Sequence, residues 1–105
     1  MFILRNESTN SVLLNKKQTM MILCRDRRAA ESAVKAIRSR FGISMTYDRV
    51  DRAKTAGLWS LRRRNGKPFE LERGVEIAFT DKPAAWKCAG SIFNDTSKIL
   101  IPTQA

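Results

Sequence analysis

The strongest periodic pattern in the chain lies in residues 26–42, where apolar side chains recur at the spacing of an α-helix. These positions are Ala30, Val34, Ile37 and Phe41, with Ala33 beside them. Asp26 before the run is a suitable N-cap, and Gly42 after it is a suitable C-terminal stop. The opposite side and its flanks carry the basic residues Arg27, Arg28, Lys35 and Arg38. The pattern predicts an amphipathic helix with a cationic outer face.

A second helical pattern follows in residues 81–93. Thr80 or Asp81 can cap it, and Pro83 suits its first turn. One face is apolar, with Ala85, Cys88, Ala89 and Ile92 on it and Trp86 and Phe93 beside it. Gly90 is an unfavourable residue inside a helix. Because Trp59 and Trp86 both lie on the apolar side of a predicted element, we expect both in the core.

Short apolar or alternating runs predict eight strands. They cover residues 1–4, 11–14, 19–24, 43–47, 58–63, 68–72, 75–79 and 98–102. The polar connection between residues 48 and 57 is expected to hold one helical turn. Pro102 is expected to stop the last strand and to leave residues 102–105 as a short tail. No internal repeat and no low-complexity linker is apparent.

A chain of 105 residues is long enough for one domain, residues 1–105, and too short for two separate cores. The element order predicts an α+β fold, with a mainly antiparallel sheet and two helices packed on one face. From residue 19 onward the order fits a split β-α-β topology of the ferredoxin-like kind. Its central part also fits the order of a double-stranded-RNA-binding domain, and order alone does not choose between these folds.

Charge adds a prediction about partners. Twenty Lys and Arg residues against ten Asp and Glu residues give a net charge of +10. Residues 25–64 carry twelve of the basic residues and four of the acidic ones, so most of the excess lies in the middle third. A positive field of this kind attracts polyanions. Nucleic acid is therefore the first partner to consider, and an acidic protein surface is the second.

The two cysteines and the N-terminus predict a compartment. Cys24 and Cys88, with no further cysteine framework, are typical of thiols in a protein of the cytosol. The first residues, MFILRNESTN, hold only four apolar residues before a polar stretch. This run is shorter than the core of a signal peptide or a membrane span. We therefore expect a soluble cytoplasmic protein without a membrane partner.

The segment SLRRRNGKPFEL, residues 60–71, predicts a hairpin with a basic tip. A two-residue Asn-Gly turn would mix apolar and charged groups on both faces. A three-residue loop, Arg64–Gly66, with Gly66 in the left-handed conformation keeps one face apolar. It pairs Leu61 with Phe69 and Trp59 with Leu71. It also sets Arg63 directly opposite Lys67, where two like charges destabilise each other unless an anion lies between them.

These features favour a small, non-catalytic nucleic-acid-binding protein. Arginines at a hairpin tip and on a helix can contact phosphates without reading a base sequence. Tyr47 is the best candidate for stacking on a base, although strand tyrosines more often lie at the edge of a core. The predicted contact residues are Arg62, Arg63, Arg64, Lys67, Arg27, Arg28, Lys35, Arg38 and Tyr47. The competing interpretation of the hairpin arginines is that they keep an exposed strand edge soluble.

Two other function classes stay open. The first is an accessory or inhibitor module of the phage or mobile-element type, whose arginines dock on an acidic surface of a host protein. The second is a metal-free ribonuclease toxin, with arginines at the phosphate and Tyr47 or Glu70 for proton transfer. The chain has no histidine, no metal-ligand cluster and no nucleotide-binding loop, so an enzyme, a metal and a cofactor are not expected. A homodimer through an exposed strand edge also stays open.

Overall fold

Both helices form where the apolar spacing and the capping residues predict them. In the computed structural model, which describes residues 1–105, α1 spans Arg27–Phe41 and α2 spans Lys82–Thr96. The Asp26 side chain accepts a hydrogen bond from the amide of Ala29 at 2.8 Å, and Asp81 accepts one from the amide of Ala84 at the same distance. These caps satisfy amide groups that the first turn of a helix leaves without partners.

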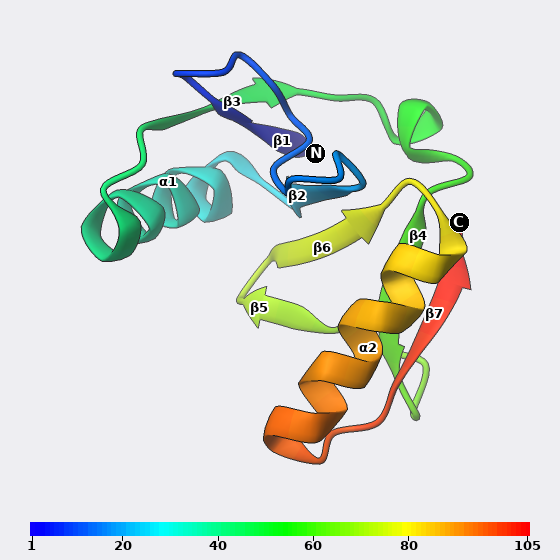
Figure 1. The fold of residues 1–105 in the computed structure, drawn as a ribbon. Coiled ribbons are helices and arrows are strands. Elements are labelled where there is room, and N and C mark those ends of the chain that lie inside the picture. The colour runs from blue at the N-terminus through cyan, green and yellow to red at the C-terminus, as the bar shows by residue number, and fades with distance from the viewer.

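Seven strands form one antiparallel sheet, and both helices pack on the same face of it (Figure 1). The strands are β1 (Phe2–Asn6), β2 (Met20–Cys24), β3 (Met45–Arg49), β4 (Trp59–Arg63), β5 (Glu70–Glu72), β6 (Val75–Phe79) and β7 (Leu100–Gln104). The strand order is β3-β1-β2-β6-β4-β7, and β5 pairs with β6 beside β4. The predicted α+β architecture is therefore confirmed. The polar connection holds the predicted helical turn, at Arg52–Thr55.

Three expectations about the elements are wrong. Residues 11–14 form no strand: Ser11 makes only an isolated bridge with Asn6, and Leu13 and Leu14 pack into clusters on the two faces of the sheet. Pro102 does not stop the last strand, which continues to Gln104. The backbone of Pro102 points to the free side of this edge strand, where a missing N–H breaks no hydrogen bond. Trp86 is not a core residue, since 51% of its surface is exposed.

The core has three parts. Under α1, Phe2, Leu4 and Cys24 pack against Ala30 and its neighbours on the helix. Under α2 lies a second cluster, which includes Leu61, Ile77, Phe79, Ala85 and Leu100 and contacts the half-buried Trp59, so the core prediction for Trp59 is confirmed. The third cluster lies on the other face of the sheet, around Met21, Leu23 and Ala78. Burial, together with the nearby Asp26, raises the pKa of the Cys24 thiol to about 11. Neither helix is both long and apolar enough to cross a membrane.

The structure contains an internal repeat that the sequence does not reveal. Residues 1–50 and 58–105, here called the first and second halves, each form a strand, an inner strand, a helix and an edge strand. The bounds of β2, α1 and β3 coincide with those of β6, α2 and β7 after a constant shift of 55 residues. In each half the first strand, β1 or β4, lies between the other two, so each half is a split β-α-β unit.

The backbone pairing repeats as well as the bounds. With a shift of 57 for the first strand and 55 elsewhere, Phe2–Cys24 corresponds to Trp59–Phe79, Phe2–Arg49 to Trp59–Gln104, and Asn6–Met45 to Arg63–Leu100. The two inner strands pair with each other, and Ile22 lies opposite Ile77, its own counterpart. A pseudo-two-fold axis perpendicular to the sheet therefore passes through this pair.

Low identity hides the repeat. From Met20 to Arg49, only five of the thirty residues match their counterparts, so the sequences alone do not align. The five matches are Ile22 with Ile77, Asp26 with Asp81, Ala29 with Ala84, Ala30 with Ala85, and Ile37 with Ile92. They comprise a cap and apolar positions between sheet and helix. Packing and capping are shared, and the surfaces of the two halves differ.

Candidate nucleic-acid interface

The hairpin between β4 and β5 has the predicted three-residue loop. Gly66 has a φ of +84°, and its amide donates to the carbonyl of Arg63 at 2.9 Å. The amide of Arg63 donates to the carbonyl of Lys67 at 2.8 Å, which makes these two residues the closing pair. Asn65 stabilises the loop by accepting a hydrogen bond from the Lys67 amide at 3.0 Å. The predicted opposition of two cations at the mouth of the loop is confirmed.

The predicted register holds near the tip and fails further from it. The amide of Phe69 donates to the carbonyl of Leu61 at 2.9 Å, which confirms this pair. Trp59 does not pair with Leu71, because β5 separates from β4 and pairs with β6 instead. Leu71 is consequently 50% exposed on the helix side of the sheet. Pro68 lies opposite Arg62, between the hydrogen-bonded pairs Arg63–Lys67 and Leu61–Phe69, at a position where its missing N–H breaks no hydrogen bond of the hairpin.

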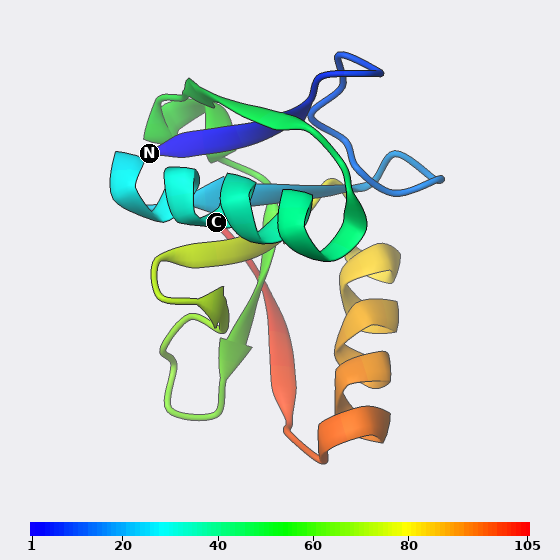
Figure 2. The same cartoon turned by 90° about the vertical axis from the view of Figure 1, so that its left-hand side faces the viewer.

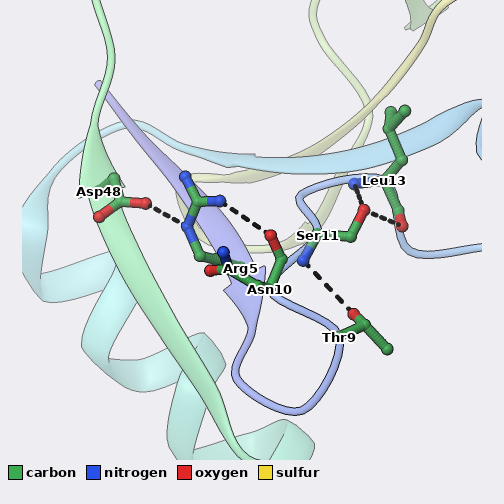
Figure 3. Close-up of polar contacts among 6 residues, drawn as sticks. All are labelled: Arg5, Thr9, Asn10, Ser11, Leu13 and Asp48. Carbon is green, nitrogen blue, oxygen red and sulfur yellow. Dashed lines mark hydrogen bonds and ion pairs between the residues drawn. The ribbon is translucent and has the colours of Figure 1, made fainter.

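Arg62 and its counterpart in the first half, Arg5, donate to corresponding backbone carbonyls but differ in their ionic contacts. The Arg62 guanidinium donates to the carbonyl of Gly66 at 3.0 Å, and the Arg5 guanidinium donates to the carbonyl of Asn10 at 3.1 Å. Arg5 also donates through Nε to the Asp48 carboxylate at 2.7 Å (Figure 3). The residue that corresponds to Asp48 in the second half is Thr103. The fold therefore supplies a directly paired carboxylate to Arg5, and no ion pair of this kind to Arg62.

Most cations of the protein lack an ionic partner. Of the twenty Lys and Arg residues, only Arg5 and Arg25 have a carboxylate oxygen within 4.0 Å. Arg63, Arg64 and Lys67 are exposed, and Arg62 is half-buried. Glu70 does not form an ion pair with them, because its carboxylate accepts a hydrogen bond from the amide of Gly74. None of the four hairpin cations therefore forms an ion pair within the chain.

An unexpected carboxylate lies beside the hairpin on the face of the sheet that the helices leave free. Glu76 is half-buried on β6, directly opposite Glu70 on β5. Desolvation and the neighbouring charge of Glu70 raise the pKa of Glu76, and the charges of Arg62, Arg52 and Arg25 lower it. These three arginines come from different segments and lie near one carboxylate.

The first turn of α1 lies on the same side of the molecule as the hairpin. In Figure 2 the loop at residues 64–67, the turn at residues 73–74 and the start of α1 all lie on the left. The turn contacts the helix closely, since a Cβ added to Gly74 would lie 3.0 Å from the Cβ of Ala29. Arg27 and Arg28 are thus near the turn at residues 73–74, which lies at the end of β5 away from the 64–67 loop. Lys35 and Arg38 lie roughly 12 and 16 Å further along the helix axis than Arg27.

The same side carries arginines that the sequence did not single out. The guanidinium carbons of Arg27 and Arg49 lie 5.9 and 5.8 Å from the centre of the Phe2 ring, so both stack near one aromatic side chain. Arg25 follows β2, and Arg52 begins the helical turn after β3. Their separation in the sequence conceals this grouping, and only the net charge of residues 25–64 pointed towards it.

Tyr47 has structural partners that account for its position. Its hydroxyl donates to the Glu31 carboxylate at 2.9 Å, and this hydrogen bond raises the pKa of Tyr47. Its ring packs edge to face on Phe2, with 5.6 Å between the ring centres. It lies on the helix face of the sheet, whereas Glu70 and Glu76 face the other side. Stacking of Tyr47 on a base stays a prediction.

The arrangement can bind an extended polyanion along one side of the molecule. The hairpin provides Arg62, Arg63, Arg64 and Lys67, and the adjoining end of the sheet provides Arg25, Arg27, Arg28, Arg49 and Arg52. We call these nine residues the arginine side. No group of three or more Cys, Asp or Glu side chains is placed to hold a metal ion. The chain matches no protein-family model, no curated protein and no solved structure.

Proposed function

We propose that the protein binds nucleic acid without catalysis, by holding backbone phosphates along the arginine side. One observation carries the proposal: the fold pairs Arg5 with Asp48 in the first half, whereas the equivalent Arg62 has no carboxylate oxygen within 4.0 Å. The second hairpin then adds three exposed cations, where the first hairpin has Asn6, Glu7 and Ser11. Because the loop after β1 is closed by the corresponding backbone hydrogen bond, from Asn6 to Ser11, without these cations, the fold itself does not require this charge.

The two like charges at the mouth of the loop support a phosphate at that point. Arg63 and Lys67 are held opposite each other by the backbone hydrogen bond between them. Like charges at such a pair are destabilising, and an anion between them removes that penalty. Phosphate contacts of this kind give affinity without sequence specificity. The proposal therefore expects binding that tolerates changes of base sequence.

The first test is binding to single-stranded RNA, duplex RNA and duplex DNA over a salt series, after bound nucleic acid has been removed. If about six cations contact phosphates, affinity for a duplex should fall with a log–log slope of roughly −5 against salt concentration. Absence of binding to all three probes at about 50 mM salt would contradict the proposal. Binding that hardly changes with salt would also contradict it.

A triple variant locates the interface. Replacing Arg62, Arg63 and Arg64 by serine should weaken binding at least several-fold and make the salt slope shallower by roughly 2 to 3. The matched control replaces Lys16, Lys17 and Lys87 by serine, which removes the same charge from exposed sites away from the hairpin. Equal losses in both variants would show that net charge alone, and not the hairpin, governs binding.

A single substitution tests the charge of Arg62 without removing any cation. Thr103→Asp places a carboxylate where Asp48 lies relative to Arg5, and it should neutralise Arg62 and weaken binding several-fold. Thr103→Asn supplies the same shape without the charge. Ser91→Asp adds the same charge on the exposed side of α2. If all three variants bind equally well, Arg62 does not contact phosphate.

The same arginines would also suit an acidic protein surface, which is the second partner considered. Nucleic acid is favoured because the arginine side is an extended set of exposed cations without an apolar centre. An apolar protein interface would keep its affinity in high salt, whereas phosphate binding would lose it. The proposal places the protein in the cytoplasm, where nucleic acid is available and where the free thiols Cys24 and Cys88 are stable.

A further inference from the structure

The outer face of α2 carries apolar side chains that contribute little to the core. Trp86 and Phe93 are 51% and 48% exposed, and Ile99, just before β7, is 48% exposed. Gly90 lies between the two aromatic residues, one turn from each along the helix. The side chains of Trp86, Phe93 and Ile99 surround a shallow hollow over Gly90. We call these four residues the Trp86 face.

The first half of the molecule shows that the fold does not require an apolar face here. The counterparts of Trp86, Gly90 and Phe93 on α1 are Glu31, Lys35 and Arg38, which are all exposed and charged. In the first half, Tyr47 on the edge strand also reaches over and bonds to Glu31. Its counterpart on β7 is Pro102, which cannot do so. The Trp86 face is thus a feature of the second half alone.

Gly90 has no role that the isolated chain explains. A Cβ added there would meet no heavy atom within 4 Å, and its φ is not in the left-handed region. Inside a helix, glycine is less favourable than alanine. An unfavourable residue at an open point between two exposed aromatic rings makes room for another helix to approach closely. Large exposed apolar residues around such a hollow are typical of a protein interface.

We propose that the Trp86 face is covered by the same face of a second copy, so that two α2 helices cross antiparallel at Gly90. Trp86 lies four residues before Gly90 and Phe93 lies three residues after it. An antiparallel crossing at Gly90 therefore sets Trp86 of each copy against Phe93 of the other and brings the two hollows over Gly90 face to face. This self-complementarity is what a two-fold interface requires. A partner of unrelated sequence would not need it.

Charge favours a second copy on this face and opposes it elsewhere. Each chain has a net charge of +10, so two copies repel each other over most of their surfaces. α1 has five basic residues and one acidic residue, whereas α2 has two basic residues and one acidic residue. The ammonium group of Lys82 lies 5.6 Å from the Trp59 ring centre, which draws it towards the sheet. The Trp86 face itself has no charged residue.

Pairing of two β7 edges is not part of the proposal. Pro102 has no N–H to donate to a partner strand on the free side of β7, so an added strand would lose a hydrogen bond there. Contact through helices alone buries less than the roughly 800 Å² per partner of a standard interface. We therefore expect a weak dimer, with a dissociation constant of about 10–100 µM. The inference does not depend on the proposed function.

Sedimentation equilibrium of the full chain, free of nucleic acid, tests the dimer. Dimerisation should be visible between about 10 µM and 1 mM protein and should strengthen at least several-fold from about 50 to 500 mM salt, because salt screens the repulsion. Trp86→Ser and Gly90→Leu should each weaken it at least ten-fold. Gly90→Leu replaces glycine with a better helix former, so its effect cannot come from unfolding. Phe41→Ser, which removes a 70% exposed aromatic residue elsewhere, should have no effect.

A crosslink tests the geometry directly. In the Cys88→Ala background, Gly90→Cys should form an intermolecular disulfide under mild oxidation, because the two helices are closest at this residue. Lys87→Cys in the same background, on another side of α2, should not.

A chain that is monomeric up to about 1 mM in high salt would overturn the inference. A dimer that survives both Trp86→Ser and Gly90→Leu would overturn it as well. Loss of nucleic-acid binding would not affect the inference of a dimer. Added salt weakens phosphate binding and strengthens the proposed dimer, so the two associations can be told apart.

Discussion

Single residues decide which of the two corresponding hairpins carries cations that form no ion pair. Asp48 in the first half and Thr103 in the second differ by one carboxylate, and this difference leaves Arg62 without the charge partner that Arg5 has. The turn at Gly66 could be predicted from sequence because Asn-Gly chemistry and alternation are local signals. The partner of Arg5 could not, because Asp48 is 43 residues away and is brought close only by the pairing of β1 with β3.

Glu76 gives a residue-scale prediction for pH. Its folded-state pKa lies above the ordinary value of 4.5, chiefly because of desolvation. The folded state therefore binds the proton more tightly than the unfolded state does, and ionisation of Glu76 reduces stability as pH rises through its folded-state pKa. Glu76→Gln removes this effect. It should raise the free energy of unfolding at pH 7, and the gain should vanish below about pH 4.

Urea unfolding at pH 7 and at about pH 4 measures this gain. Glu72→Gln is a suitable control, because Glu72 is an exposed carboxylate on the neighbouring strand and should show little gain at either pH. If Glu76→Gln destabilises the protein at pH 7, attraction to Arg62, Arg52 and Arg25 outweighs desolvation. The carboxylate would then be an ionic anchor for these arginines.

At the scale of elements, local signals predict the helices well and the strands less well. Fifteen-residue helices with Asp caps repeat their apolar spacing over several turns, so α1 and α2 fall where the pattern predicts. Five-residue strands carry less information, and residues 11–14 look like a strand although only Ser11 forms a bridge, with Asn6. The course of β5 also depends on a non-local choice, because it leaves β4 for β6.

The turn between β5 and β6 gives an element-scale prediction about packing on α1. Gly66 and Gly74 both have positive φ, +84° and +81°, but a Cβ at Gly66 meets open space whereas one at Gly74 lies 3.0 Å from the Cβ of Ala29. Gly66→Ala should lower the free energy of unfolding by about 1–2 kcal/mol through backbone strain alone. Gly74→Ala should lower it by about 1–3 kcal/mol more, because it also overpacks the contact with α1.

The two variants are matched in backbone conformation, so the difference between them measures the contact. Urea denaturation of each gives the two free energies. Equal effects would mean that α1 shifts away from the turn at no cost. In that case the first turn of α1 and the hairpin are not held in a fixed relation, and the arginine side is not a rigid surface.

At the scale of the whole molecule, the repeat explains why the sequence predicted the parts better than their assembly. Each half is specified by caps and apolar spacing that any ββαβ unit would need, and these are the positions at which the two halves agree. The order of the sheet depends on the pairing of Ile22 with Ile77, between segments far apart in sequence. The sequence singled out the charged hairpin, but its lack of an ion pair and the exposure of the Trp86 face are recognised only by comparison with their counterparts, which requires the structure.

The pseudo-two-fold axis predicts that the halves can be exchanged in chain order. The amide of Val50 donates to the carbonyl of Met1 at 2.9 Å. The amide of Ala105 donates to the carbonyl of Leu58 at 3.0 Å. The axis relates these two contacts, so the gap from Ala105 to Met1 matches the gap from Val50 to Leu58. Residues 51–57 bridge the second gap. A chain that begins at Leu58, continues from Ala105 through a copy of residues 51–57 and ends at Val50 should therefore fold.

Its free energy of unfolding should lie within about 2 kcal/mol of the native value, because all strand and helix contacts are kept and only the position of the linker changes. Urea unfolding and amide NMR spectra of the two chains measure this directly.

A second permutant with the same linker, opened between Gly42 and Ile43, cuts the connection from α1 to β3 inside the first half. It should be less stable than the first, because its opening separates a helix from the strand that completes its split β-α-β unit. The permutant that starts at Leu58 could instead be the less stable of the two. In that case the repeat in strand pairing does not extend to the gap that the linker bridges, and the two halves are not interchangeable units.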